Sequence, residues 1–166
     1  MIISRVWNMP DKNTFNIKPI SMLIHKYKDL LPQNAIIVDP FANENKIATI
    51  TNDIDNQYDT DYHMDALDFL KTFNDKSIDF LLFDPPYSPR QVSECYKKVG
   101  YTVNMQTTQA SYWSNLKKEI GRIVKPGGFV LTCSWNSGGI GKNMDLISKK
   151  YCWFLMVVGI MIQLLL

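Results

Sequence analysis

This chain of 166 residues has few cysteines and a small net charge. Its three cysteines, Cys95, Cys133 and Cys152, lie far apart and form no C-x-x-C pair, which argues against a disulfide scaffold or a zinc knuckle and fits a reducing cytoplasm. The 18 basic residues nearly balance the 16 acidic ones, so charge neither indicates nor excludes a nucleic-acid partner. The first residues lack the basic start and apolar run of a signal peptide.

Composition and length indicate one ordinary globular domain. Hydrophobic residues make up 46% and charged residues 20%, which excludes a disordered tail or a collagen-like repeat. The length suffices for one domain and not comfortably for two. We expect a single domain over residues 1–166, with an N-terminal segment at 1–34, a core at 35–150 and an atypical tail at 151–166.

Short apolar runs alternate with helical patterns along the core. The runs predict strands at residues 35–38, 47–51, 78–83 and 129–133. The patterns predict helices at 21–31, 64–73, 89–99, 111–124 and 142–150. Because alternating strands and helices form βαβ units, we expect an α/β fold with a doubly wound, mostly parallel sheet covered on both faces.

Three of the predicted strands are followed by an acid. Asp39, Asp53 and Asp84 stand after the first, second and third apolar runs. In an open α/β sheet the ligand crevice lies outside the carboxyl ends of the strands, at the point where the strand order reverses. Acids gathered there can bind hydroxyl and amine donors, so the pattern predicts a ligand site.

The sharpest motif is Asp84-Pro85-Pro86-Tyr87, which follows a strongly apolar run. The structural alternative is a rigid turn that an aspartate caps. The functional interpretation accounts for all four residues. An aromatic exocyclic amine is a poor nucleophile because its lone pair is delocalised, and two acceptors on its hydrogens, the Asp84 carboxylate and the Pro85 carbonyl, can free that lone pair. The prolines restrict the backbone, and the Tyr87 ring offers a face on which a planar base can stack.

With this motif the sequence resembles the amino-methyltransferases that use S-adenosylmethionine, most closely the small N6-adenine DNA methyltransferases of phage and mobile elements. The D-P-P-Y form is more typical of enzymes that methylate adenine N6, whereas enzymes that methylate cytosine N4 more often have serine at the first position. The resemblance implies a Rossmann-like fold, S-adenosylmethionine as cofactor, and methylation of adenine in double-stranded DNA with the target base flipped out. It implies Asp84, Pro85, Pro86 and Tyr87 as catalytic residues.

Other segments resemble the cofactor-binding elements of that family, in the family's order. Phe15-Asn16-Ile17-Lys18-Pro19 is similar to an F-x-x-K-P element that contacts the methionine end of the cofactor. Val38-Asp39-Pro40-Phe41 stands where the family has its D-P-F-x-G cofactor loop, and Asp53 where an acid holds the ribose hydroxyls. Asp65-Ala66-Leu67 resembles the element that meets the adenine, and Lys125-Pro126-Gly127-Gly128 the turn before the fifth strand.

One departure from the family concerns the loop after the first strand, which usually carries glycines. This chain has Phe41-Ala42-Asn43-Glu44-Asn45 there. Asparagine is the residue other than glycine that best tolerates a positive φ, so we expect Asn43 or Asn45 to make the turn. The stretch up to residue 47 is too short for a crossover helix, and we expect a loop and weak cofactor affinity.

Two further residues are candidates for contact with the substrate. Arg90 belongs to a segment that mixes basic and aromatic residues, which suits phosphate contact and base stacking, although a solvated helix explains its lysines equally well. Trp135 could flank the flipped base or pack in the ordinary way. No segment is long enough for a separate target-recognition domain. The DNA sequence to be methylated is therefore selected by loops, by a partner protein or by a second copy in a homodimer, or sequence selectivity is relaxed.

Residues 53–68 hold six aspartates and one histidine. The EF-hand spacing is absent, and transfer of a methyl group from a sulfonium needs no metal. We therefore interpret the segment as a solvated acidic loop with two acids that face the cofactor, and we predict no metal site.

The tail at 151–166 carries no charge, yet it is shorter than the about 20 apolar residues of a membrane helix, so no membrane partner is expected. The family's fold ends in a β-hairpin with polar turn residues, and we expect that hairpin to be incomplete here. Codons for the tail can be chosen that encode a strand, a polar turn and a strand when read one base earlier. We therefore hypothesise a frameshifted end, which the nucleotide sequence around codon 150 would test.

Two alternatives to a DNA enzyme stay open. The first keeps the fold and changes the substrate to the base amine of an RNA or to a guanine amine. The second is a non-catalytic remnant that binds nucleic acid or a partner protein. The missing glycines and the tail favour the remnant, and the intact D-P-P-Y motif opposes it.

Overall fold

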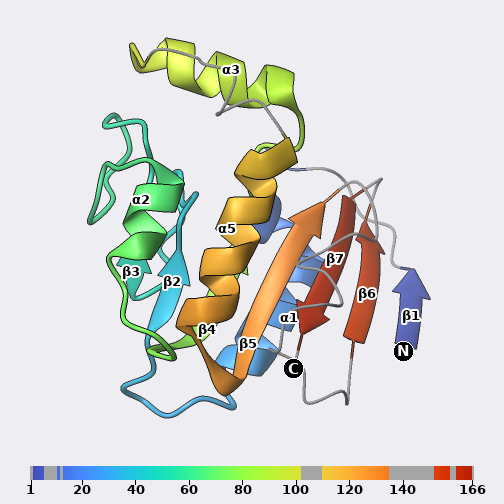
Figure 1. Ribbon diagram of the computed structural model, residues 1–166. Coiled ribbons are helices and arrows are strands. Elements are labelled where there is room, and N and C mark those ends of the chain that lie inside the picture. The colour runs from blue at the N-terminus through green and yellow to red at the C-terminus, as the bar shows by residue number, and fades with distance from the viewer. Residues whose placement is uncertain are drawn as a thin grey trace.

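The computed structural model describes residues 2–5, 11, 13–101, 110–134, 152–157 and 160–165. Trp135 and the helix predicted at 142–150 lie outside the described residues. Strands from both ends of the chain join one sheet with the order β1-β6-β7-β5-β4-β2-β3. Figure 1 shows this sheet edge to edge, with helices in front of it and behind it.

The parallel part of the sheet contains β2 (Ile37–Asp39), β3 (Ile50–Thr51), β4 (Ile78–Phe83) and β5 (Val124–Ser134). β2 pairs in parallel with β3 and with β4, and β4 pairs in parallel with β5. Strand β4 covers the predicted residues without change and is buried at five of its six positions. The prediction of a mostly parallel α/β sheet is confirmed.

The tail forms the hairpin that we expected to be incomplete, and that prediction is wrong. β6 (Cys152–Val157) and β7 (Ile160–Leu165) pair antiparallel along their length. β7 also pairs antiparallel with β5, and β1 (Ile2–Arg5) adds to the outer edge of β6 in parallel. The physical reason is that an uncharged run rich in apolar and β-branched residues suits strands inside a sheet, where no polar alternation is required.

Helices cover both faces of the sheet. The short 3-10 helix η1 (Thr14–Asn16) and α1 (Lys18–Lys28) pack on one face, against Phe80 and Leu82 of β4. Helices α2 (Ala66–Lys71), α3 (Pro89–Lys98) and α5 (Ala110–Ile123) share the other core with Leu81 and Phe83. These assignments follow the alternation of side chains along a strand. Within the described ranges, every helix is too short or too polar to span a bilayer.

Two helices begin at residues that suit the unpaired backbone N–H groups of a first helical turn. α1 begins at Lys18, three residues before the predicted start, because Pro19 fits the first turn of a helix, where its missing N–H would have no partner. α2 is shorter than predicted and begins after Asp65, whose carboxylate accepts a hydrogen bond from the Leu67 backbone at 2.8 Å.

Three strands differ from the predicted bounds, and the first of them, β2, covers Ile37–Asp39 where residues 35–38 were predicted. β3 is shorter than the strand predicted at 47–51, and directly before it the Thr49 hydroxyl accepts the Ile37 N–H at 2.8 Å. β5 begins at Val124 and not at the predicted Phe129, because the turn predicted at 125–128 lies inside the strand as an irregularity in its pairing with β4. The pairing passes from Ile78 with Val124 to Phe80 with Phe129, which accommodates the turn residues.

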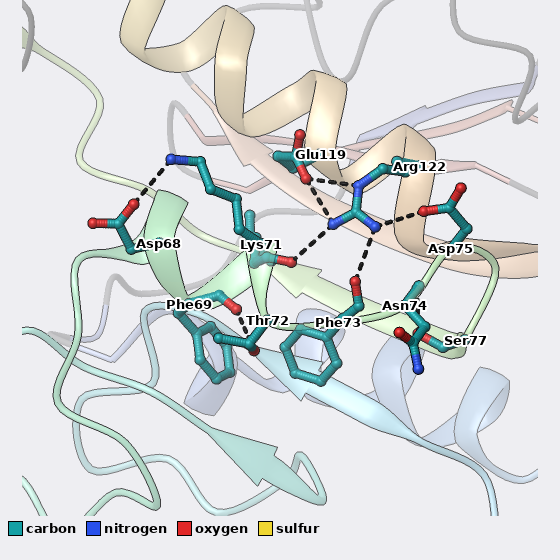
Figure 2. Close-up of polar contacts among 11 residues, drawn as sticks. Asp68, Phe69, Lys71, Thr72, Phe73, Asn74, Asp75, Ser77, Glu119 and Arg122 are labelled. Atoms are coloured by element: carbon teal, nitrogen blue, oxygen red, sulfur yellow. Dashed lines mark hydrogen bonds and ion pairs between the residues drawn. The ribbon is translucent and has the colours of Figure 1, made fainter.

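Arg122 joins the end of α5 to the end of α2 (Figure 2). Its guanidinium donates to the carbonyl oxygens of Phe73 at 2.9 Å and of Leu70 at 3.4 Å, and it pairs with the carboxylates of Asp75 and Glu119. Leu70 lies in the last turn of α2 and Phe73 just after it, where carbonyl oxygens lose their regular helical partners; the Leu70 oxygen also accepts the Phe73 N–H at 3.4 Å. The arginine therefore fixes α2, and with it the loop that leads into the cavity described next.

Candidate active site

A cavity of about 410 Å³ opens at the carboxyl ends of β2 and β4. The chain leaves β2 toward β3 on one side and leaves β4 toward β5 on the other, so the cavity lies at the point where the strand order reverses. In Figure 1 this is the end of the sheet below α3. Eight residues predicted for the site line it: Phe41, Asn43, Asp53, Ala66, Asp84, Pro85, Pro86 and Tyr87.

The Asp84-Pro85-Pro86-Tyr87 corner is anchored directly after the Pro85 carbonyl, at the peptide bond between Pro86 and Tyr87. The indole Nε1 of Trp113 donates to the Pro86 carbonyl oxygen at 3.0 Å, and the Tyr87 backbone N–H donates to Oε1 of Gln91 at 2.7 Å. No described residue donates a hydrogen bond to the Pro85 carbonyl. That oxygen is therefore held in place by its neighbours while its own lone pairs remain available.

Asp84 is partly buried, and two hydroxyl groups contact its carboxylate. The Tyr87 hydroxyl donates a hydrogen bond to Oδ1, and the Thr14 side chain hydrogen-bonds the same carboxylate. Burial raises the pKa of Asp84 above its usual range, and both hydrogen bonds oppose that rise because they favour the ionised form. The Tyr87 hydroxyl has its own pKa raised by burial and by the Asp84 charge, so it remains a donor.

Asp39, the last residue of β2, is 1% exposed and does not itself line the cavity. Its Oδ1 accepts the Phe41 backbone N–H at 3.0 Å, whereas Oδ2 has no hydrogen-bond partner among the described residues. Burial raises the pKa of Asp39 well above its usual range, and the charges of Asp84 and Asp53 raise it further. The three acids that follow the predicted strands therefore meet at one edge of the sheet.

Asp53 faces the cavity with both carboxylate oxygens fixed by backbone donors. Oδ2 accepts the N–H of Asn43 and Oδ1 accepts the N–H of Asp55, each at 2.9 Å. Asn43 has a φ of 47°, so an asparagine makes the left-handed turn for which the family uses glycine, as predicted. The chain from residue 41 to 47 contains no helix, which confirms the predicted loop.

Helix α3 adds cavity residues that the sequence analysis missed. Gln91, Cys95 and Lys98 all line the cavity from this helix. The Lys98 ammonium pairs with Asp55 at 2.6 Å and lies 5.6 Å from the centre of the Tyr58 ring. The hydrogen bond from Lys98 lowers the pKa of Asp55. The spacing of four and three residues was an available signal, because it places these residues on one helix face.

Tyr96 and Tyr112 form the wall between α3, α5 and the start of α2. The Tyr96 hydroxyl donates to Asp65, whose other oxygen caps α2, so both oxygens of this predicted adenine contact already have protein partners. The pKa of each tyrosine is raised by burial, which keeps both phenols protonated. Asp65 itself does not line the cavity, although the neighbouring Ala66 does.

Four other predicted residues also lie away from the cavity lining. Phe15 is buried in the core under α1, and Lys18 and Pro19 form the first turn of that helix. Arg90 is on the exposed side of α3, where it pairs with Glu94 at 2.8 Å. Thr14, directly before the F-x-x-K-P segment, is the residue of this region that reaches the cavity.

Among the described residues, no group of three or more histidine, cysteine, aspartate or glutamate side chains could hold a metal ion. Comparison with protein-family models finds no match, and comparison with curated proteins finds none either.

Proposed function

We propose that the protein is a methyltransferase that transfers a methyl group from S-adenosylmethionine to the exocyclic N6 amine of adenine in DNA. One observation carries the proposal: all four residues of the Asp84-Pro85-Pro86-Tyr87 corner line a cavity at the reversal point of a parallel sheet. A capped structural turn has no need of a hollow beside it. The choice of adenine N6 and of DNA rests on the resemblance of this motif to the small adenine methyltransferases.

The residues around the cavity fit the proposed cofactor. Its ribose diol needs an oriented acceptor, which Asp53 supplies, and its adenine needs apolar walls such as Phe41, Ile54 and Met64. The buried Asp39 has a carboxylate oxygen without a described partner, and an unpartnered buried acceptor favours a cationic ligand nearby. When bound, S-adenosylmethionine supplies a methyl group already activated by its sulfonium, so the protein has only to position and activate the amine.

The corner activates the amine by accepting its hydrogens. The Asp84 carboxylate would take one N–H and the Pro85 carbonyl the other, which draws the nitrogen toward tetrahedral geometry and frees its lone pair for attack. Because Trp113 and Gln91 hold the peptide bond that follows the Pro85 carbonyl, the two acceptors need little reorganisation when the amine arrives. The ring of Tyr87 would stack on the base, which leaves the double helix because its amine is otherwise paired.

The geometry weakens one argument for a non-catalytic remnant. The absent glycines favoured that alternative, because the cofactor loop needs a tight turn. Asn43 makes this turn at a positive φ and donates its N–H to Asp53, so the loop keeps the acid oriented without glycine. The remnant alternative therefore rests on the unusual tail.

The test is transfer of isotope-labelled methyl from S-adenosylmethionine to duplex DNA and, in parallel, to RNA. We expect label in DNA with the natural chain, and loss of at least about a hundredfold in rate with Asp84→Ala. Titration calorimetry should show that Asp84→Ala still binds the cofactor. The matched control is Asp29→Ala, which removes an exposed carboxylate far from the cavity. Equal transfer by Asp84→Ala would refute the assigned role, and label in RNA alone would change the substrate.

A further inference from the structure

The Asp84 carboxylate receives hydroxyl donors from two different parts of the chain. The Tyr87 hydroxyl reaches Oδ1 from three residues along the same corner. Thr14 reaches the carboxylate from η1, which is about 70 residues earlier in the chain and packs on the α1 face of the sheet. All three residues line the cavity. The contacts therefore gather at the position that the substrate amine would approach.

Asp84 takes part in no salt bridge between described residues. Among the described residues, the ionisable groups that interact with it are Asp39 at the end of β2, Cys133 on β5 and Tyr87 in the corner, and none of them is a base. A buried carboxylate without a cation tends to take up a proton, and a protonated Asp84 would offer its O–H where the amine needs an acceptor.

We propose that Thr14 and Tyr87 are positioning residues whose hydroxyl groups keep the buried Asp84 carboxylate ionised and correctly oriented for the amine. The inference rests on the proposed function and adds to it a role for the Tyr87 hydroxyl that is separate from stacking by the ring. Hydrogen bonds to an ionised group are stronger than those between neutral groups, so two hydroxyl donors can offset part of the cost of burial.

The backbone around Tyr87 explains how the hydroxyl is held on Asp84. The Tyr87 N–H is bonded to the Gln91 side chain at 2.7 Å, and the Gln91 N–H is bonded to the Ser88 hydroxyl at 3.2 Å. The first turn of α3 thus fixes the residue from which the ring projects. Tyr87 also packs against the core under α1, so its ring has little freedom to swing away.

The test removes one hydroxyl at a time without removing the side chain. Tyr87→Phe keeps the ring, Thr14→Val keeps the shape, and Thr14→Ser restores a hydroxyl. Tyr27→Phe is the control, since Tyr27 is a buried tyrosine on α1 that does not line the cavity. The first readout is carboxyl-carbon NMR of aspartate-labelled protein, titrated with pH, with the Asp84 signal assigned from Asp84→Asn. The second is the pH dependence of methyl transfer.

We expect Tyr87→Phe and Thr14→Val to raise the pKa of Asp84 by about one pH unit each, because each removes a donor to the charged form. Thr14→Ser and Tyr27→Phe should titrate like the natural chain. The pH at which the transfer rate falls on the acidic side should rise by the same amount. One pH unit below the natural chain's own midpoint, the variants should transfer methyl about tenfold more slowly than the natural chain, and at high pH their rates should recover.

The two readouts separate this inference from the proposed function. An unchanged Asp84 titration in both hydroxyl-deletion variants would overturn the inference, whether or not methyl is transferred. A raised pKa together with no transfer by the natural chain would support the hydroxyl role and refute the methyltransferase. A rate loss in Tyr87→Phe that is constant with pH would also overturn the inference, because it would assign the hydroxyl to something other than ionisation of Asp84.

Discussion

The indole of Trp113, on α5, donates a hydrogen bond to the carbonyl oxygen of Pro86, 27 residues earlier and directly beyond the Pro85 carbonyl. This contact ties the Asp84-Pro85-Pro86-Tyr87 corner to a helix whose other end is fixed to α2 through Arg122. The corner is therefore held by tertiary contacts as well as by the stiffness of its two prolines. Two of the following predictions test these contacts, and two test the acids at the carboxyl edge of the sheet.

Trp113→Phe should slow methyl transfer without weakening cofactor binding. Phenylalanine keeps an aromatic ring in the half-buried position and removes the donor to Pro86, so the corner loses an anchor on the side of the Pro85 carbonyl. We expect kcat to fall about tenfold with the KM for S-adenosylmethionine unchanged, measured by steady-state kinetics. A matched fall in cofactor affinity would show that the tryptophan supports the whole cavity and not the corner in particular.

Asp53→Asn should weaken cofactor binding. Both oxygens of Asp53 accept backbone N–H groups, and an asparagine would set its own amide donor against one of them. We expect the dissociation constant of S-adenosylmethionine to rise about tenfold or more in titration calorimetry. Asp59→Asn is the matched control in the same loop, because Asp59 is exposed and lies outside the cavity lining. Equal effects of the two changes would contradict a specific role for Asp53.

Asp39→Asn should stabilise the protein at high pH and not at low pH. Because burial raises the pKa of Asp39 above its unfolded value, the folded protein binds this proton more readily than the unfolded chain, and stability is lost as pH rises through the folded pKa. The variant keeps an acceptor for Phe41 and carries no charge. We expect its melting temperature to match the natural chain near pH 4 and to exceed it by about 2–4 °C near pH 8, measured by calorimetry.

The same substitution should reduce affinity for S-adenosylmethionine, because it removes the unpartnered carboxylate that suits a cationic ligand. A gain in stability together with a loss of affinity is the pattern of a residue retained for function. Stability that is unchanged at both pH values would contradict a buried, unpartnered charge at this position.

Arg122→Ala should destabilise the fold. The change leaves the carbonyls of Phe73 and Leu70 without this donor and removes two ion pairs. We expect a loss of about 1–3 kcal/mol in the free energy of unfolding, measured by urea denaturation. Lys71→Ala is the control, because Lys71 makes only an exposed pair with Asp68 and should contribute little. A loss in the control equal to that in Arg122→Ala would contradict the capping role.

Features that depend on neighbouring residues were predictable from the sequence. Strand β4 and the corner after it follow from one apolar run and its closing motif, and the loop at 41–47 follows from its length. The turn at Asn43 follows from the tolerance of asparagine for positive φ. In each case the signal and the structure that it determines lie within a few residues of each other.

Contacts that depend on packing were not predictable in this way. Thr14 reaches Asp84 across most of the described core, and Trp113 reaches Pro86 from a different helix. Lys98 pairs with Asp55, so a side chain that could have contacted phosphate instead borders the cavity. The tail differed for another reason: an uncharged apolar run does not show from the sequence alone which strands it will join, and pairing with β5 makes it an inner strand. The frameshifted end stays a hypothesis that the nucleotide sequence tests.

The central claim is that the Asp84 corner presents an adenine amine for methylation. Its most direct test is mass spectrometry of nucleosides from digested DNA of cells that express the natural chain or Asp84→Ala. The account predicts N6-methyladenine with the natural chain, at least about a hundredfold less with Asp84→Ala, and no other methylated base in either sample. Absence of N6-methyladenine with the natural chain, although it binds S-adenosylmethionine, would contradict the account.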